Sequence, residues 1–228
     1  MDRKTREALL EYMQEFITEE RKQLFDKILN YRTRHITVVL EDLYQPHNAS
    51  AVLRTCDLTG IQDVHVIENK NKYDVNPDVA LGSSKWLNLV KYDEPGDNTL
   101  KAFKKLKKQG YRIVATTPHK DIQTPQTIPL ESKMALVFGT ELTGLSKVAI
   151  EHADEHLKIP MYGFTESFNI SVSAALILYI LTDRLRNSGI NWQLTPGEMN
   201  DIRLEWVKRT LRKPEIFEKE FLKSYKSK

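Results

Sequence analysis

Residues 159–175 read IPMYGFTESFNISVSAA and join two different patterns. The segment begins like the end of an apolar strand, turns polar after Gly163, and then becomes small and apolar like the start of a buried helix. Ser167 and Asn169 stand at this junction, where side chains that cap helices are common. A cap needs only one of them, so the polar run indicates either a routine turn and cap or one wall of a binding site.

The same sequence of strand, polar loop and helix occurs twice earlier in the chain. HITVVLED at 35–42 is followed by QPHNASAVLRT at 45–55, and MALVF at 134–138 is followed by GTELTGLS at 139–146. In parallel α/β sheets, ligands bind beyond the carboxyl ends of the strands. Each loop alone fits a turn with a cap, but three polar strand ends together predict a site.

Strand and helix patterns alternate through the middle of the chain. Further strands are expected at VHVIEN (64–69), WLNLVKYD (86–93), YRIVATTP (111–118) and HLKIPM (156–161). Helices are expected at about 49–59, 98–110, 146–153 and 169–187. This alternation predicts the α/β class, with a parallel sheet covered by helices on both faces.

Both ends of the chain have helical patterns instead. Residues 2–30 predict two helices, with Thr18 at the start of the second, and Thr195 before Pro196 is an expected N-cap. A last helix is expected after Pro214. We therefore expect an N-terminal helical extension at 1–34, a central domain at 35–188 and a C-terminal helical extension at 189–228.

Composition narrows the class of protein. The single Cys56 excludes an internal disulfide, suits a reducing compartment and lies in an apolar helical pattern typical of core. We find no uncharged apolar run of about 18 residues and no apolar signal core, so a cytoplasmic protein without a membrane span is expected.

Residues 184–228 carry eleven Lys or Arg against six Asp or Glu. This basic end indicates either a polyanionic partner or a solvated helical surface.

Other familiar site motifs are missing or weak. The sequence has neither GxGxxG nor GxxxxGK[ST], which excludes those two phosphate-binding fingerprints. His152 and His156 have a spacing that can bind zinc on a helix, but the strand expected at 156 breaks it, so no metal site is expected. With Asn48 as the N-cap, Arg54 would lie in apolar surroundings and need a partner, in a binding site or in a structural ion pair.

The three polar segments resemble the three motifs of the SpoU branch of the SPOUT methyltransferases. They are NASAVLRT (48–55), FGTELTGLS (138–146) and IPMYGFTESFNISVSAA, and the resemblance covers about 35–187. The longer string VLEDLYQPHNASAVLRTCDLTGIQDVHVIE is similar to the TrmH subgroup of tRNA guanosine-2′-O-methyltransferases. The sequence departs from the pattern at Ser50, where many members have Gly, and at Phe168, where Leu is usual.

This resemblance implies an S-adenosyl-L-methionine-dependent enzyme that methylates the ribose of guanosine 18 in the D-loop of tRNA. It also implies a homodimer and a deep C-terminal trefoil knot. The implied cofactor-binding residues are Thr116, Thr117, Gly139, Ile159, Met161, Phe168 and Asn169. The implied catalytic residues are Arg54, Asn48, Glu141, Ser167 and Asn169.

Arg54 is the central residue of the implied chemistry, which displaces the cofactor's methyl group by a ribose 2′-hydroxyl. Arg54 could lose its proton and act as a base, or remain charged, bind a phosphate and stabilise the developing alkoxide. We favour the second role because a guanidinium stays protonated in proteins. Asn48 would orient Arg54 or the ribose, Glu141 would pair with or place Arg54 within a subunit or across the dimer, and Ser167 and Asn169 would line the transfer pocket.

RNA recognition is expected to depend on phosphate and shape. The expected RNA-binding residues are basic: His47, Arg32, Arg34, Arg184, Arg186, Arg209, Arg212 and Lys213. Two alternatives remain. One is a 2′-O-methyltransferase of the same superfamily that acts on ribosomal RNA or another tRNA position, and the other is a non-catalytic RNA-binding factor.

Overall fold

The computed structural model describes residues 1–43, 45–72, 82–118, 123–140 and 143–225. Contacts divide the chain into two compact units. The larger unit is Thr33–Trp192, and the second combines Met1–Arg32 with Gln193–Lys228. Each unit is described by itself.

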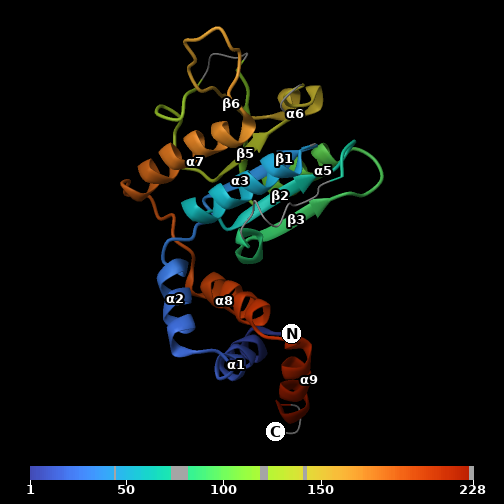
Figure 1. Cartoon of the computed structure of the whole chain (residues 1–228), viewed down its shortest axis with the longest axis vertical. Coiled ribbons are helices and arrows are strands. Elements are labelled where there is room, and N and C mark those ends of the chain that lie inside the picture. Colours follow the sequence, from blue (N-terminus) through green and yellow to red (C-terminus); the bar gives the residue numbers. More distant parts are fainter. Residues whose placement is uncertain (44, 73–81, 119–122, 141–142, 226–228) are drawn as a thin grey trace. The chain divides into compact units, whose positions relative to one another are not determined.

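The larger unit contains a six-stranded sheet in which every pairing is parallel (Figure 1). Its strands are β1 (Ile36–Glu41), β2 (Asp63–Ile67), β3 (Asn88–Tyr92), β4 (Arg112–Thr116), β5 (Met134–Phe138) and β6 (Glu155–Leu157). They are arranged in the order β3-β2-β1-β5-β4-β6. The parallel α/β class expected from the sequence is confirmed.

The centre of the sheet is its most apolar part. Every residue of β1 and of β5 is buried, including Thr37 and Glu41 of β1. β5 pairs with β1 on one side and with β4 on the other, so it has no free edge. A strand that has neighbours on both edges and helices on both faces usually has a continuous apolar sequence. The sequences of β1 (ITVVLE) and β5 (MALVF) nearly follow this rule.

Among the described residues of this unit, four α-helices cover the two faces of the sheet. They are α3 (Pro46–Thr59), α5 (Asn98–Lys108), α6 (Lys147–His152) and α7 (Ile170–Arg186), and a short 3-10 helix η1 spans Ser83–Trp86. One core joins α3 and α7 to side chains such as Val38 and Leu136. A second core joins α5 and α6 to the opposite face through Val39 and Val137. Cys56 lies in the first core, as expected.

Two element boundaries differ by three or more residues from the sequence-based expectations, and the others differ by one or two residues at most. α3 begins at Pro46 instead of about 49, because a proline suits the first position of a helix. β6 ends at Leu157 instead of continuing to 161. Pro160 has no N–H to donate, and the Lys158 N–H bonds to the Gln123 carbonyl outside the named strands.

The second unit contains four helices among its described residues: α1 (Arg3–Gln14), α2 (Glu19–Leu29), α8 (Pro196–Thr210) and α9 (Pro214–Tyr225). The Trp206 ring packs against Phe25 with 5.3 Å between the ring centroids. Thr18 caps α2, and Thr195 forms a capping box with Glu198, which confirms both expected caps. Within the described part of the chain, no helix has the length and apolar character that crossing a membrane requires.

Candidate functional site

A cavity of about 420 Å³ opens at the carboxyl edge of the sheet, within the size range of small-molecule sites. The residues that line it lie at or after the carboxyl ends of β4, β5 and β6. Of these three strands, β4 lies in the middle and pairs with both of the others. The described lining is Thr116, Thr117, Pro118, Phe138, Gly139, Thr140, Thr143, Gly144, Leu145, Ile150, Glu166, Ser167, Phe168, Ile170 and Ser173. A smaller space of about 70 Å³ shares several of these residues and adds Ile159 and Met161.

Short hydrogen bonds fix the loop after β4 to its neighbours. The Thr116 hydroxyl donates to the Val137 carbonyl at 2.7 Å, and the Thr117 N–H donates to the Leu157 carbonyl at 3.0 Å. The three parallel strands therefore end at one level, and their loops meet above the same edge.

The described residues on either side of the loop after β5 lie close together. Thr140 and Gly144 exchange two backbone hydrogen bonds of 3.0 Å, and the hydroxyls of Thr140 and Thr143 are 2.8 Å apart. A Cβ atom at Gly139 would lie 2.3 Å from the Gly144 carbonyl carbon and oxygen. The close approach requires glycine at position 139 and leaves a smooth backbone wall on the cavity.

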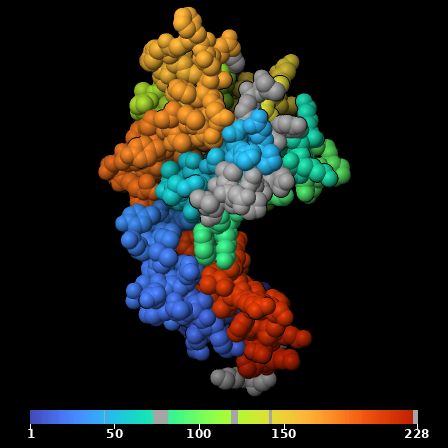
Figure 2. Space-filling view, in the orientation of Figure 1, coloured from blue at the N-terminus to red at the C-terminus, as the bar shows by residue number. Residues whose placement is uncertain are grey.

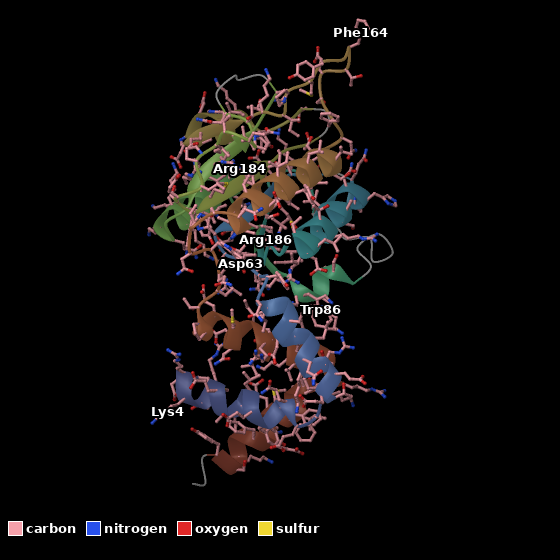
Figure 3. The ribbon with its side chains drawn as sticks, turned by 90° about the vertical axis from the view of Figure 1, so that its left-hand side faces the viewer. Lys4, Asp63, Trp86, Phe164, Arg184 and Arg186 are labelled. Carbon is pink, nitrogen blue, oxygen red and sulfur yellow. The ribbon has the colours of Figure 1, made fainter. Side chains whose placement is uncertain are left out.

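The segment between β6 and α7 forms the remaining wall and also projects from the unit, as the orange upper part of Figure 2 shows. Phe164 lies at the tip of this projection and is fully exposed (Figure 3). Phe168, at the base of the segment, is 44% exposed and lines both spaces. The sequence departure at Phe168 therefore faces the cavity.

A hydrogen bond joins the starts of α3 and α7. The Asn169 side-chain amide donates to the Asn48 oxygen at 3.2 Å, while the Asn169 oxygen accepts from the Ser171 N–H at 2.9 Å and caps α7. The expectation that Asn48 caps α3 is wrong. Gln45 precedes Pro46 at the helix start, so Asn48 lies in the first turn, where its amide donates to the Gln45 side chain at 3.0 Å.

Arg54 lies on the exposed face of α3, which corrects the expectation of apolar surroundings. Val52, Leu53 and Cys56 face the core, so the helical turn directs Arg54 outward. Within the described ranges Arg54 takes part in no salt bridge, and it is not among the described cavity-lining residues. Its expected partner Glu141 lies outside the described residues.

The structure brings most of the expected cofactor-binding residues together. Thr116, Thr117, Gly139 and Phe168 line the larger cavity with Ser167, and Ile159 and Met161 line the smaller space. Asn169 lies between the lining residues Phe168 and Ile170 but is not itself in the described lining. Sequence reasoning missed Thr140, Thr143, Glu166 and Ser173, although all four lie inside the polar segments that drew attention.

The sequence model of the SpoU rRNA methylase family matches residues 35–179, more than half of the chain. The chain belongs to this family. A tRNA (guanosine(18)-2′-O)-methyltransferase of Borreliella burgdorferi is 46% identical over 206 residues, which cover 90% of this chain and 93% of that protein. The TrmH/SpoU tRNA modifying enzyme of A. aeolicus has the same fold, with a TM-score of 0.76, 29% identity and coverage of 86% and 98%.

A second solved structure of the family is similar in fold. It is the SpoU methyltransferase AviRb of Streptomyces viridochromogenes in complex with the cofactor AdoMet, with a TM-score of 0.58 and 23% identity. The match covers 72% of this chain and 62% of that chain. At this level of identity the likeness concerns the fold.

The basic residues nominated for RNA in this SpoU methylase differ in exposure. His47, Arg186, Arg212 and Lys213 are exposed, whereas Arg34, Arg184 and Arg209 are half-buried. Arg34 pairs with Asp63 at 2.9 Å, and Arg184 and Arg186 donate to the carbonyls of Pro125 and Thr59. Asp63, Arg184 and Arg186 are labelled in Figure 3.

The expectation that Arg32 binds RNA is wrong. Its side chain is buried, and its guanidinium lies 5.3 Å from the centroid of the Trp206 ring. A buried guanidinium stacked on an aromatic ring serves the core of the unit and does not reach a phosphate. Arg32 is therefore removed from the RNA-binding set.

Three ionisable groups with shifted pKa values lie away from the cavity lining. Burial lowers the pKa of His65 to about 4 and raises the pKa of Tyr92 to about 12, and the His65 Nδ1 and Tyr92 hydroxyl are 3.0 Å apart. Burial also lowers the pKa of His35, whose Nε2 is 2.6 Å from the Leu130 carbonyl. These groups affect stability and not the candidate chemistry.

Histidines with metal-like spacing take other roles here. His156 lies in β6, so it does not share a helix face with His152, and each contacts a backbone carbonyl. In the described part of the chain, no group of three or more His, Cys, Asp or Glu side chains is placed to hold a metal ion.

Proposed function

We propose that this chain is an S-adenosyl-L-methionine-dependent tRNA (guanosine(18)-2′-O)-methyltransferase. One observation carries the proposal: described residues from three segments far apart in sequence, at 116–118, 138–140 with 143–145, and 166–168 with 170 and 173, line one cavity in a chain that is 46% identical to a relative with that activity in its name. The match extends over 90% of the chain, so it includes residues outside the family motifs.

The cavity suits the cofactor in size and chemistry. Phe138, Leu145 and Phe168 provide apolar surface for a planar purine, while Thr116 and Ser167 provide hydroxyls. Gly139 lines the cavity with its backbone alone, and backbone N–H and C=O groups can read a purine edge. We assign binding of the adenine and ribose to Thr116, Thr117, Gly139, Ile159, Met161, Phe168 and Asn169. When bound, S-adenosylmethionine supplies an activated methyl group, as AdoMet binding by AviRb suggests.

Arg54 contributes a fixed positive charge in this proposal. An exposed guanidinium binds an RNA phosphate in a forked geometry and stabilises negative charge that develops on the ribose oxygen. Asn48 orients the ribose, and its bond to Asn169 sets the distance between α3 and the transfer pocket. Ser167 lines the cavity, and Glu141 is the proposed partner of Arg54.

A homodimer completes the proposed site. Helix α7 exposes Val172, Leu176 and Tyr179 at helical spacing, and Leu58 of the adjacent α3 is 76% exposed. This apolar surface next to Arg54 fits a second copy of the chain. Packing of two copies would bring the Arg54 of one subunit towards the cavity of the other, which accounts for its exposure.

The finer architecture also belongs to the proposal. We assign residues 35–188 to the methyltransferase domain, with a C-terminal trefoil knot formed where segment 159–169 passes the loops after β4 and β5. Residues 1–34 and 189–228 are helical extensions, and the exposed Arg212 and Lys213 of the second extension bind tRNA phosphates together with His47, Arg34, Arg184, Arg186 and Arg209. A cytoplasmic location follows from the tRNA substrate.

Transfer of a tritiated methyl group to whole tRNA, followed by mapping of the modified nucleotide, tests the function. We expect one ribose methyl at guanosine 18 and none on a transcript with 2′-deoxyguanosine at that position. Methylation of ribosomal RNA alone, of another tRNA position or of a base would contradict the assignment. Cofactor binding without any transfer would support the non-catalytic alternative.

A further inference from the structure

Glu41, the last residue of β1, holds a buried carboxylate outside the described cavity lining. Its Oε1 accepts hydrogen bonds from the Thr99 hydroxyl at 2.5 Å and from the Ser146 hydroxyl at 2.8 Å. Its Oε2 accepts a third from the Ser146 backbone N–H at 2.8 Å. A buried carboxylate is costly unless its oxygens are satisfied, so these three donors explain how the chain tolerates Glu41 there.

Ser146 is the point at which the loop after β5 meets helix α6. Its hydroxyl also accepts from the Ala149 N–H at 3.0 Å and so caps that helix. The two residues before it, Gly144 and Leu145, line the cavity, and Gly144 is locked to Thr140 by paired backbone bonds. The described ends of the loop are therefore paired with each other, and they are held by β5 on one side and by the Glu41 carboxylate on the other.

The residues around Glu41 make this anchor rigid. Thr99 also accepts a hydrogen bond from the Asn69 amide at 2.9 Å, which ties it to the loop after β2. The next residue, Asp42, accepts from the N–H groups of Asn69 and Lys70 at 2.7 and 2.8 Å. β1 itself pairs with β2 and β5 through its backbone, so the position of the Glu41 backbone does not depend on its side chain.

We propose that Glu41 is a positioning residue for the cofactor: it holds the cavity-lining residues 143–145 in place through Ser146, without touching the cofactor. The inference rests on the proposed function, because it assigns a purpose to the loop shape. Loss of the carboxylate would free the Ser146 end of the loop, and the cavity wall at Gly144 and Leu145 would sample other positions. A wall that must be ordered on binding lowers affinity, because the ordering cost is subtracted from the binding free energy.

Calorimetric titration of S-adenosylmethionine into the full chain tests this, with Glu41→Ala and Glu41→Gln as variants. We expect Glu41→Ala to weaken binding about tenfold to a hundredfold, the range for loss of charge-assisted hydrogen bonds. Glu41→Gln keeps the shape and one acceptor oxygen, so it should fall between wild type and Glu41→Ala. In transfer assays the KM for the cofactor should rise more than kcat falls.

Hydrogen exchange supplies a readout that is independent of activity. Without cofactor, Glu41→Ala should speed exchange at the amides of Gly144 and Ser146, while the amides of β1 and β5 stay protected. Asp63→Ala is the matched control, because that carboxylate also accepts two side-chain bonds, from Arg34 at 2.9 Å and Asn88 at 2.8 Å, but lies at the amino end of β2. It should lower thermal stability and leave cofactor affinity unchanged.

The outcomes separate the two proposals. A wild-type chain that does not bind S-adenosylmethionine would overturn the proposed function and this inference with it. Normal wild-type binding with unchanged binding by Glu41→Ala would overturn the inference alone, as would an equal loss of affinity in Asp63→Ala. If Glu41→Ala does not fold, Glu41→Gln and Ser146→Ala replace it. Their effects on affinity should then be less than additive, because both act on the same bond, and additive effects would overturn the inference.

Discussion

The Asn169 side-chain amide donates a hydrogen bond to the Asn48 oxygen across 121 residues of sequence, at a distance of 3.2 Å. The bond joins the cap of α7 to the first turn of α3, so two polar strand ends that look unrelated in sequence act as one structure. Asn48 is 9% exposed, which leaves little freedom for its side chain to turn away.

Replacement of Asn169 tests whether this bond serves the reaction as well as the helix. Asn169→Ala removes both the cap and the bond, whereas Asn169→Asp keeps an acceptor for Ser171 and loses the donor to Asn48. We expect Asn169→Ala to lower the free energy of unfolding by about 1 kcal/mol, the usual value of a cap, and Asn169→Asp to lower it less. Both should reduce methyl transfer in single-turnover assays. Normal transfer by Asn169→Asp would limit the residue to capping.

Arg54→Ala separates charge stabilisation from folding. Because Arg54 is exposed, its loss should leave the melting temperature and cofactor affinity unchanged while transfer falls about 100-fold or more, as for loss of a group that stabilises the transition state. Arg54→Lys keeps the charge without the fork and should recover only part of the activity. A rate that stays flat for Arg54→Ala would contradict the proposed role.

The salt dependence of tRNA binding tests the basic C-terminal extension. Arg212→Gln with Lys213→Gln removes two exposed charges and should lower tRNA affinity and reduce the slope of log K against log salt concentration by about one per lost phosphate contact. Lys4→Gln with Lys27→Gln removes the same charge from exposed positions in α1 and α2. Equal slopes for the two double variants would mean that net charge, and not a contact, sets the affinity.

The apolar face of α7 gives a prediction about assembly. Tyr179 is 70% exposed, so Tyr179→Lys should not harm the fold of one subunit but should oppose packing against a second copy. We expect a shift from dimer to monomer in analytical ultracentrifugation and a parallel loss of methyl transfer. Leu100→Lys on α5, where the leucine is 39% exposed, is the matched control and should stay dimeric.

Acid stability should depend on His65. Its pKa is about 4 in the folded protein against 6.5 for a free histidine, so the unfolded state binds the proton more readily between these values. The contribution of neutral His65 is complete above pH 6.5 and is lost as pH falls towards 4, and the difference corresponds to roughly 3 kcal/mol at most. Urea unfolding at pH 4 to 7 should show a shallower decline for His65→Gln. His35, whose pKa is lowered in the same direction, remains in both proteins and keeps part of the slope.

Much of this fold was predictable from local pattern. The periodic spacing of apolar residues predicted where the strands and helices lie. Thr18 and Thr195 predicted the starts of their helices, because a cap is a local interaction. The position of β5 between β1 and β4 was not predictable, since strand order depends on contacts between distant segments. The end of β6 was also missed, because the apolar IPM run looked like strand although Pro160 cannot donate to a ladder.

The site was predictable in its polar segments and less so in its details. Thr116, Gly139 and Phe168 lie together because parallel strands end at one edge, which the alternating pattern implies. The surroundings of Arg54 were misjudged because the sequence neighbours of a helical residue face other directions. No role was predicted for Glu41, because a single acidic residue at a strand end forms no recognisable sequence motif. Its three hydrogen-bond donors come from segments that are distant in sequence.

The central position of β5 has a consequence for biosynthesis. Thr37 pairs with Ala135, so one edge of β1 stays unpaired until the ribosome has made β5, almost a hundred residues later. Until then β1, β2 and β3 form a half-sheet whose most apolar strand has an open edge, the kind of surface that recruits other chains. Truncation before β5 should therefore yield aggregates, and the nascent chain should depend on holding factors until residue 138 has left the ribosomal tunnel.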